Sequence, residues 1–114
     1  MPMIEVGISL LQQTQPAITI MALVDSGSDA SLLPVSVFDL IRAIPVDKVR
    51  IRGILGQSYP ANLYSVNIYI GIHRLFARQI AGVNSTEDIL IGRNVLNQLE
   101  VILNGPASTI EIII

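Results

Sequence analysis

The sequence predicts an all-β fold of many short strands with one short helix near its C-terminus. Two observations support this prediction. Most of the 114 residues fall into short apolar or alternating runs separated by turn residues such as Gly, Pro, Asn and Ser, as expected of strands joined by turns. Residues 91–99 are the best helix candidate, because the apolar residues at positions 91, 95, 96 and 99 lie on one helix face.

The chain is predicted to begin with two strands. Residues 4–10 alternate between apolar and other side chains, which indicates a half-buried strand. Residues 12–16 are predicted to turn the chain, and residues 17–24 form a nearly continuous apolar strand. This second strand leads directly into the polar loop 25–29, so we expect the loop to be held at the end of a buried strand.

A hairpin is predicted to follow from residue 46. Residues 46–55 and 59–70 form its two strands, and the glycines at its tip are Gly53 and Gly56. The remaining predicted elements are a strand at residues 74–80, the helix at residues 91–99, and two terminal strands at residues 101–103 and 109–114.

Composition narrows the possible functions. The length of 114 residues predicts a single domain over residues 1–114. Hydrophobic residues make up 51% of the chain and charged residues 14%, so we expect this domain to bury apolar surface against a partner. The seven Lys and Arg residues are scattered along the sequence and the net charge is −2, which argues against a nucleic acid ligand. The chain has no Cys and a single histidine, His73, so we expect no metal site.

Targeting signals are not apparent in the sequence. No apolar run approaches the roughly 20 residues that span a bilayer, and the N-terminus lacks the pattern of a signal peptide. We therefore expect a soluble chain without a membrane partner, and the sequence assigns it to no particular compartment.

Asp25 is the strongest candidate for a catalytic side chain. It follows the apolar residues 21–24 and so lies at the edge of the predicted core, where an ionised carboxylate is costly unless it is hydrogen-bonded or paired. These residues alone allow two interpretations. Asp25, Ser26 and Gly27 form either an ordinary Asx-type turn or a loop in which the carboxylate has a chemical role.

Two motifs in a fixed order favour the second interpretation. Residues 23–33 read Leu-Val-Asp-Ser-Gly-Ser-Asp-Ala-Ser-Leu-Leu, and residues 88–96 read Asp-Ile-Leu-Ile-Gly-Arg-Asn-Val-Leu. The first resembles the active-site loop of the retropepsins, the retroviral-type aspartic proteases of clan AA. The second resembles the apolar strand, Gly-Arg-Asn/Asp sequence and short helix of the same family. Residues 53–56 lie between the motifs, where that family has its flap, so the resemblance covers essentially the whole chain. It implies a retropepsin-like subunit, closed and barrel-like, with a flap hairpin and one short C-terminal helix.

This resemblance implies an aspartic endopeptidase that hydrolyses extended polypeptides without a cofactor. In such enzymes two carboxylates share one proton and activate a water molecule. The chain contains a single Asp-Ser-Gly sequence, so the implied dyad consists of Asp25 and the Asp25 of a second copy in a homodimer. The terminal segments 2–10 and 109–114 match the family's segments that interleave between subunits.

The resemblance also implies roles for the residues that follow the catalytic carboxylate. Ser26 would brace the two active-site loops, Gly27 would let the substrate backbone approach closely, and Ser28 would donate a hydrogen bond to the carboxylate. Asp29 would bind the substrate main chain while forming a desolvated structural ion pair with Arg93.

Further substrate-binding roles follow from the same resemblance. The flap residues Gly53, Ile54 and Leu55 would close over the substrate, and the pockets for its side chains would be lined by Leu23, Leu33, Ile54 and Leu90. As apolar residues, these last four are equally well explained as core. The alternative function is a non-catalytic member of the family, in which the same fold serves as a dimerisation or peptide-binding module.

Overall fold

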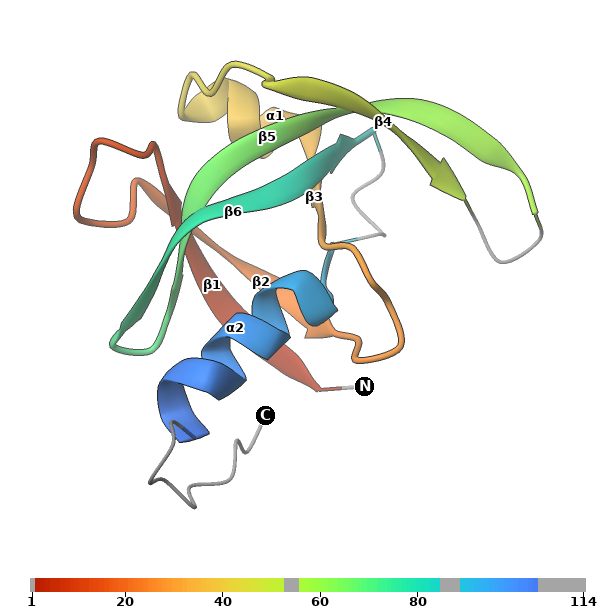
Figure 1. Cartoon of the computed structure of the whole chain (residues 1–114). Helices are drawn as coiled ribbons and strands as arrows, with labels where there is room; N and C mark the ends of the chain where they lie inside the picture. Colours follow the sequence, from red (N-terminus) through yellow and green to blue (C-terminus); the bar gives the residue numbers. More distant parts are fainter. Residues whose placement is uncertain (1, 53–55, 85–88, 105–114) are drawn as a thin grey trace.

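A computed structural model describes residues 2–52, 56–84 and 89–104 of the chain (Figure 1). Its strands are β1 (Met3–Ser9), β2 (Ile18–Val24), β3 (Leu32–Pro34), β4 (Asp47–Arg52), β5 (Ser58–Ile70), β6 (His73–Val83) and β7 (Leu90–Ile91). Its helices are α1 (Val35–Leu40) and α2 (Arg93–Asn104).

All strands except β4 form a closed ring. The order within the sheet is β1-β2-β7-β3-β6-β5-β4, and β1 pairs in addition with β5. This additional pairing places Gly7 opposite Tyr69 and Ser9 opposite Asn67, so β1 and β5 close the sheet into a ring. The predicted all-β fold is confirmed, and it takes the form of a ring of strands.

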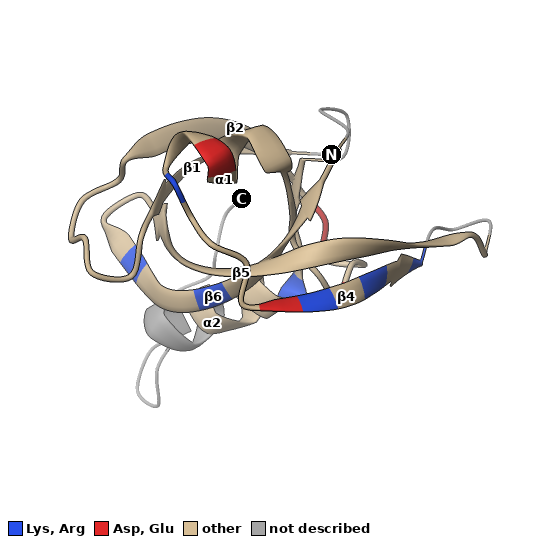
Figure 2. Cartoon of the chain, turned by 90° about the horizontal axis from the view of Figure 1, so that it is seen from above, with Lys and Arg blue, Asp and Glu red and all other residues tan. Residues whose placement is uncertain are grey.

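The long strand β5 connects this ring to a projecting hairpin. β5 has 13 residues. Near its start it pairs with β4, in a register from Arg52 opposite Ser58 to Asp47 opposite Leu63, whereas near its end it pairs with β1. The β4–β5 hairpin therefore extends outward from the ring, as Figures 1 and 2 show.

Apolar side chains from opposite parts of the chain fill the core. Val6 and Ile8 of β1 are fully buried, as the alternating sequence of residues 4–10 predicts. The prediction of a half-buried strand does not hold for the other face, because Gly7 and Ser9 are buried too and Pro16 and Tyr69 close the space at Gly7. Phe38 of α1 is also fully buried, and its ring stacks on Tyr64 of β5 with 3.9 Å between the ring centroids. The members of the core cluster that belong to α2 are Val95, Leu96 and Leu99.

The helices differ from the prediction in two respects. The sequence analysis predicts one helix and assigns residues 101–103 to a strand, but these residues belong to α2. A three-residue apolar run does not distinguish a strand from the end of an amphipathic helix, and the first helix-breaking residues after Arg93 are Gly105 and Pro106. The unpredicted α1 contains two β-branched valines, and burial of Val37 and Phe38 stabilises it.

The predicted role of residues 2–10 in an interleaved dimer interface stays a prediction. Within the chain, Met3 to Ile8 pair with β2 and Gly7 to Ser9 pair with β5. The other predicted interface segment, residues 109–114, lies outside the described residues.

Asn67 is a buried polar residue at the centre of a hydrogen-bond cluster. It lies at a register irregularity between Val66 and Ile68, and its Oδ1 accepts the N–H of Ala77 at 3.2 Å. Its Nδ2 lies 3.0–3.3 Å from four oxygens, which belong to Ser9 Oγ and the carbonyls of Leu10, Leu11 and Gln13. The side chain thus joins β5, the irregular part of β6 and the loop after β1.

We predict that Asn67→Ala lowers the free energy of unfolding by about 1–3 kcal/mol, because it removes the hydrogen bonds to several partly buried backbone groups. Urea denaturation at a fixed protein concentration measures the change. The control is Asn97→Ala on α2, where the asparagine is exposed and the expected change is below about 0.5 kcal/mol. Equal effects of the two substitutions would contradict the role assigned to Asn67.

Candidate active site

The loop that carries Asp25 begins where β2 ends beside β7. β2 and β7 are parallel, with Leu23 opposite Leu90 and Val24 opposite Ile91. The Asp25 N–H donates to the Ile91 carbonyl at 3.0 Å, which extends this pairing by one residue. The backbone position of Asp25 is therefore fixed by the sheet rather than by the loop alone.

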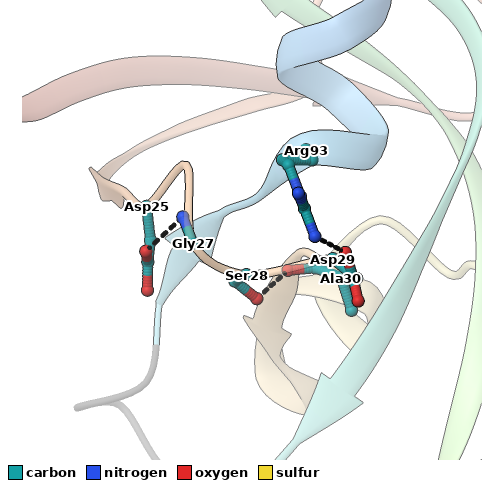
Figure 3. Close-up of polar contacts among 6 residues, drawn as sticks. All are labelled: Asp25, Gly27, Ser28, Asp29, Ala30 and Arg93. Atoms are coloured by element: carbon teal, nitrogen blue, oxygen red, sulfur yellow. Dashed lines mark hydrogen bonds and ion pairs between the residues drawn. The ribbon is translucent and has the colours of Figure 1, made fainter.

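The Asp25 side chain closes a tight turn. Its Oδ1 accepts the N–H of Gly27 at 2.9 Å, and its backbone carbonyl accepts the N–H of Ser28 at 3.2 Å (Figure 3). The Asx-type turn is therefore present. Asp25 as a residue is half-buried, and its hydrogen bond with Gly27 lies at an exposed position. The turn thus holds an accessible carboxyl group in a defined orientation, which is also what a catalytic role would require.

Gly92 allows the loop to pack directly against the start of α2. A Cβ atom at Gly92 would lie 2.3 Å from the Ala30 carbonyl oxygen and 2.7 Å from that of Ser28. The N–H of the next residue, Arg93, donates to the Ser28 carbonyl at 2.8 Å. Because backbone atoms occupy the space where a side chain would begin, only glycine fits here without a shift of the loop.

A buried serine, which the sequence analysis did not single out, joins the loop to the same helix. Ser31 is fully buried. Its Oγ accepts the N–H of Gly92 at 2.9 Å and donates to Asn94 Oδ1 at 2.6 Å. Asn94 Nδ2 in turn donates to the Gln79 carbonyl of β6 at 2.7 Å. The loop, α2 and β6 are thus connected by one chain of hydrogen bonds.

Arg93 and Asp29 form an ion pair on the outer side of the loop (Figure 3). The expectation that this pair is desolvated does not hold in the single chain, because the side chains of Arg93 and Asp29 are 50% and 86% exposed. An exposed pair of this kind contributes about 0–1 kcal/mol. The backbone contacts at Gly92, rather than this ion pair, therefore hold the loop on the helix.

The other predicted residues of the loop are placed as follows. Ser26 and Gly27 are exposed, and the roles expected for them stay predictions. The Ser28 hydroxyl donates to the Ala30 carbonyl at 2.8 Å, whereas the sequence analysis expects it to donate to the Asp25 carboxylate. The hydroxyl is therefore occupied within the loop, in a bond that a short turn between residues 28 and 30 favours.

The apolar candidates for substrate pockets separate into two groups. Leu23 and Leu90 are adjacent across β2 and β7 and are both half-buried. Leu33 is fully buried and belongs to the core, so its expected place in a substrate pocket is not supported. The flap residues Gly53, Ile54 and Leu55 lie outside the described residues.

Two further observations concern the described part of the chain. None of its helices has the length and apolar character needed to cross a membrane. Within the same residues, no three His, Cys, Asp or Glu side chains gather closely enough to hold a metal ion.

Comparison with known proteins gives the family of this chain. Residues 1–104 match the family model described as retroviral aspartyl protease. The chain belongs to the retroviral aspartyl protease family. No curated protein sequence gives a significant match.

Solved structures of retroviral proteases share the fold. The solution structure of the simian foamy virus (mac) protease matches with a TM-score of 0.60 and 16% identity, over 86% of this chain and 94% of the other. The EIAV protease complexed with the inhibitor HBY-793 matches with a TM-score of 0.64 and 19% identity, over 86% of both chains. The resemblance noted from the sequence motifs is thereby confirmed at the level of family and fold.

We predict that Gly92→Ala displaces residues 28–30 and lowers the free energy of unfolding by about 1–3 kcal/mol, because the new methyl group overlaps two carbonyl oxygens. Two-dimensional NMR should show amide shifts in the loop after Asp25. The control is Gly71→Ala, which has a positive φ of 59° but no atom within 4 Å of its added Cβ. It should destabilise the chain without moving the loop signals. Unchanged loop signals in Gly92→Ala would contradict the packing argument.

Proposed function

We propose that this chain is an aspartic endopeptidase whose active site is completed by a second copy of the chain. The observation that supports this proposal best is the placement of Asp25. Its accessible carboxyl group is held by a turn at the end of β2, and the turn is fastened to α2 through Gly92 and Ser31. Family membership supports the same function.

The proposed chemistry uses two carboxylates and one proton. One ionised Asp25 takes a proton from a water molecule, which attacks the carbonyl carbon of the peptide bond, while the protonated Asp25 of the second copy donates toward the carbonyl oxygen. The carboxyl group that took a proton from water then gives a proton to the amide nitrogen, and the bond between this nitrogen and the carbonyl carbon breaks. The other carboxylate takes a proton from the hydrated carbonyl as the carboxylic acid product forms, so the dyad returns to its singly protonated state. The rigid loop orients the carboxylate before the substrate binds, which lowers the cost of reaching the transition state.

The need for a second copy follows from counting. The chain has one Asp-Ser-Gly sequence, and a single carboxylate cannot act as acid and base at the same time. A two-fold axis beside Asp25 would bring two identical carboxylates together. The substrate class inferred from this family is an extended polypeptide, bound beside Leu23 and Leu90 and covered by residues 53–55.

We predict that Asp25→Asn lowers kcat/KM for peptide cleavage at least about 10³-fold, because the amide cannot exchange the required proton. A peptide-library digest measures turnover, with a transition-state-mimicking aspartic protease inhibitor as a second check. The control is Asp39→Asn, since Asp39 is an exposed carboxylate on α1 and should retain full activity. Peptide binding without turnover in the parent chain would instead favour the non-catalytic binding module.

We predict that mixing the two forms reveals a shared active site. If a fixed amount of parent chain exchanges subunits with a ninefold excess of Asp25→Asn, its activity should fall to about one tenth, because most parent chains then pair with an inactive copy. The measurement is made well above the dimer dissociation constant. The same excess added immediately before the assay, without time for exchange, is the control. Activity that stays constant after exchange would exclude a site built from two chains.

A further inference from the structure

The outer strand β4 concentrates positive charge that looks scattered in the sequence. Lys48, Arg50 and Arg52 are three of the seven basic residues of the chain. They occupy alternate positions, so they project from the same face of β4, and all three are exposed. Figure 2 shows these cations along β4, on a chain whose net charge is −2.

Within the described residues, these three cations form no ion pair. The residues directly opposite on β5 are Asn62, Pro60 and Ser58, which carry no charge. The Arg50 guanidinium donates to Ser58 Oγ, with 3.1 Å between Nη2 and Oγ. The carboxylate of β4 itself, Asp47, belongs to the alternate set of positions and accepts the Lys48 N–H at 2.8 Å. Among the described residues, the ion pair found is that of Arg93 with Asp29, not one on β4.

The edge of β4 is available for pairing. β4 is the last strand in the sheet order and pairs with β5, and its other edge faces no strand within the described residues. An edge of this kind presents N–H and C=O groups that can accept an additional strand. Three like charges on one face oppose the pairing of β4 with the β4 of another copy, because the cations would then face each other.

We propose that the free edge of β4 binds an extended acidic peptide segment, which adds a strand to the sheet and places carboxylates beside Lys48, Arg50 and Arg52. Side chains on one face of a strand recur about every 7 Å, so acidic residues at every second position of the peptide match the spacing of the three cations. The backbone edge supplies hydrogen bonds, and the charges select an acidic strand over a neutral or basic one.

A peptide fits this surface better than a nucleic acid does. Binding of single-stranded nucleic acid without sequence preference relies on aromatic side chains that stack on bases. The residues on the basic face of the hairpin are Lys48, Arg50, Arg52, Ser58, Pro60 and Asn62, none of which is aromatic. The negative net charge of the chain also opposes the approach of a long polyanion. This binding does not depend on the proposed catalysis.

The experiment uses the full chain with Asp25→Asn, so that no probe is cleaved. The probe is a fluorescent twelve-residue peptide of alternating Glu and Thr, and its dissociation constant is measured by anisotropy at low salt. The double variant Arg50→Glu with Arg52→Glu should weaken binding at least about tenfold. The matched control is Arg74→Glu with Arg78→Glu on β6, which changes the net charge equally and should alter binding less than about twofold.

Three further measurements test the mode of binding. A peptide of alternating Lys and Thr should bind the Arg50→Glu, Arg52→Glu variant better than it binds the parent. Two N-methylated peptides, one methylated at every Glu and one at every Thr, each lose the backbone donors of one edge. One of the two should fail to bind, whereas unchanged binding of both would overturn strand addition. Equal losses in the two double variants, or no loss in either, would also overturn the proposal. Tighter β4-dependent binding of single-stranded poly-dT or of anionic vesicles would assign the surface to a different class of partner.

Discussion

The close contact between residues 28–30 and Gly92 is the constraint on which the candidate site depends. The two segments are more than sixty residues apart in sequence, yet two carbonyl oxygens of the loop occupy the space beside the Gly92 Cα atom. This contact requires β7 to lie between β2 and β3, because only then do the end of β2 and the start of α2 emerge side by side. The position of Asp25 is thus a consequence of the topology of the ring.

The same constraint explains why the site is rich in backbone interactions. Three backbone N–H groups hold the loop. The Asp25 N–H donates to the Ile91 carbonyl, and the Arg93 N–H donates to the Ser28 carbonyl. The Gly92 N–H donates to Ser31 Oγ. Side-chain charge contributes less, because the Arg93–Asp29 pair is exposed. A loop positioned in this way tolerates changes in its exposed side chains more readily than changes in the residues that set its backbone path.

The sequence predicts the all-β fold and the position of the candidate site well, since both depend on local patterns. The alternation in β1 and the apolar run of β2 identify strands, and the two motifs identify the loop and the helix that follows Gly92. The sequence does not reveal contacts that depend on tertiary structure. Asn67 has the sequence context of a polar residue on the outer face of a strand but is fully buried, and helix α1 forms because Phe38 packs on Tyr64. The intrachain pairing of β1 and the bond from Ser28 to Ala30 are also invisible in the sequence.

The length of β5 implies that one strand belongs to two regions of different local stability. Its C-terminal part lies between β1 and β6 and includes the buried residues Val66, Ile68 and Ile70. Its N-terminal part begins with three exposed residues, which pair with the edge strand β4. Hydrogen exchange of backbone amides should therefore become progressively faster from Ile70 toward Ser58, because the outer part opens locally while the ring stays closed. β4 and the outer part of β5 can then change shape around a bound chain, while the ring that positions Asp25 stays intact.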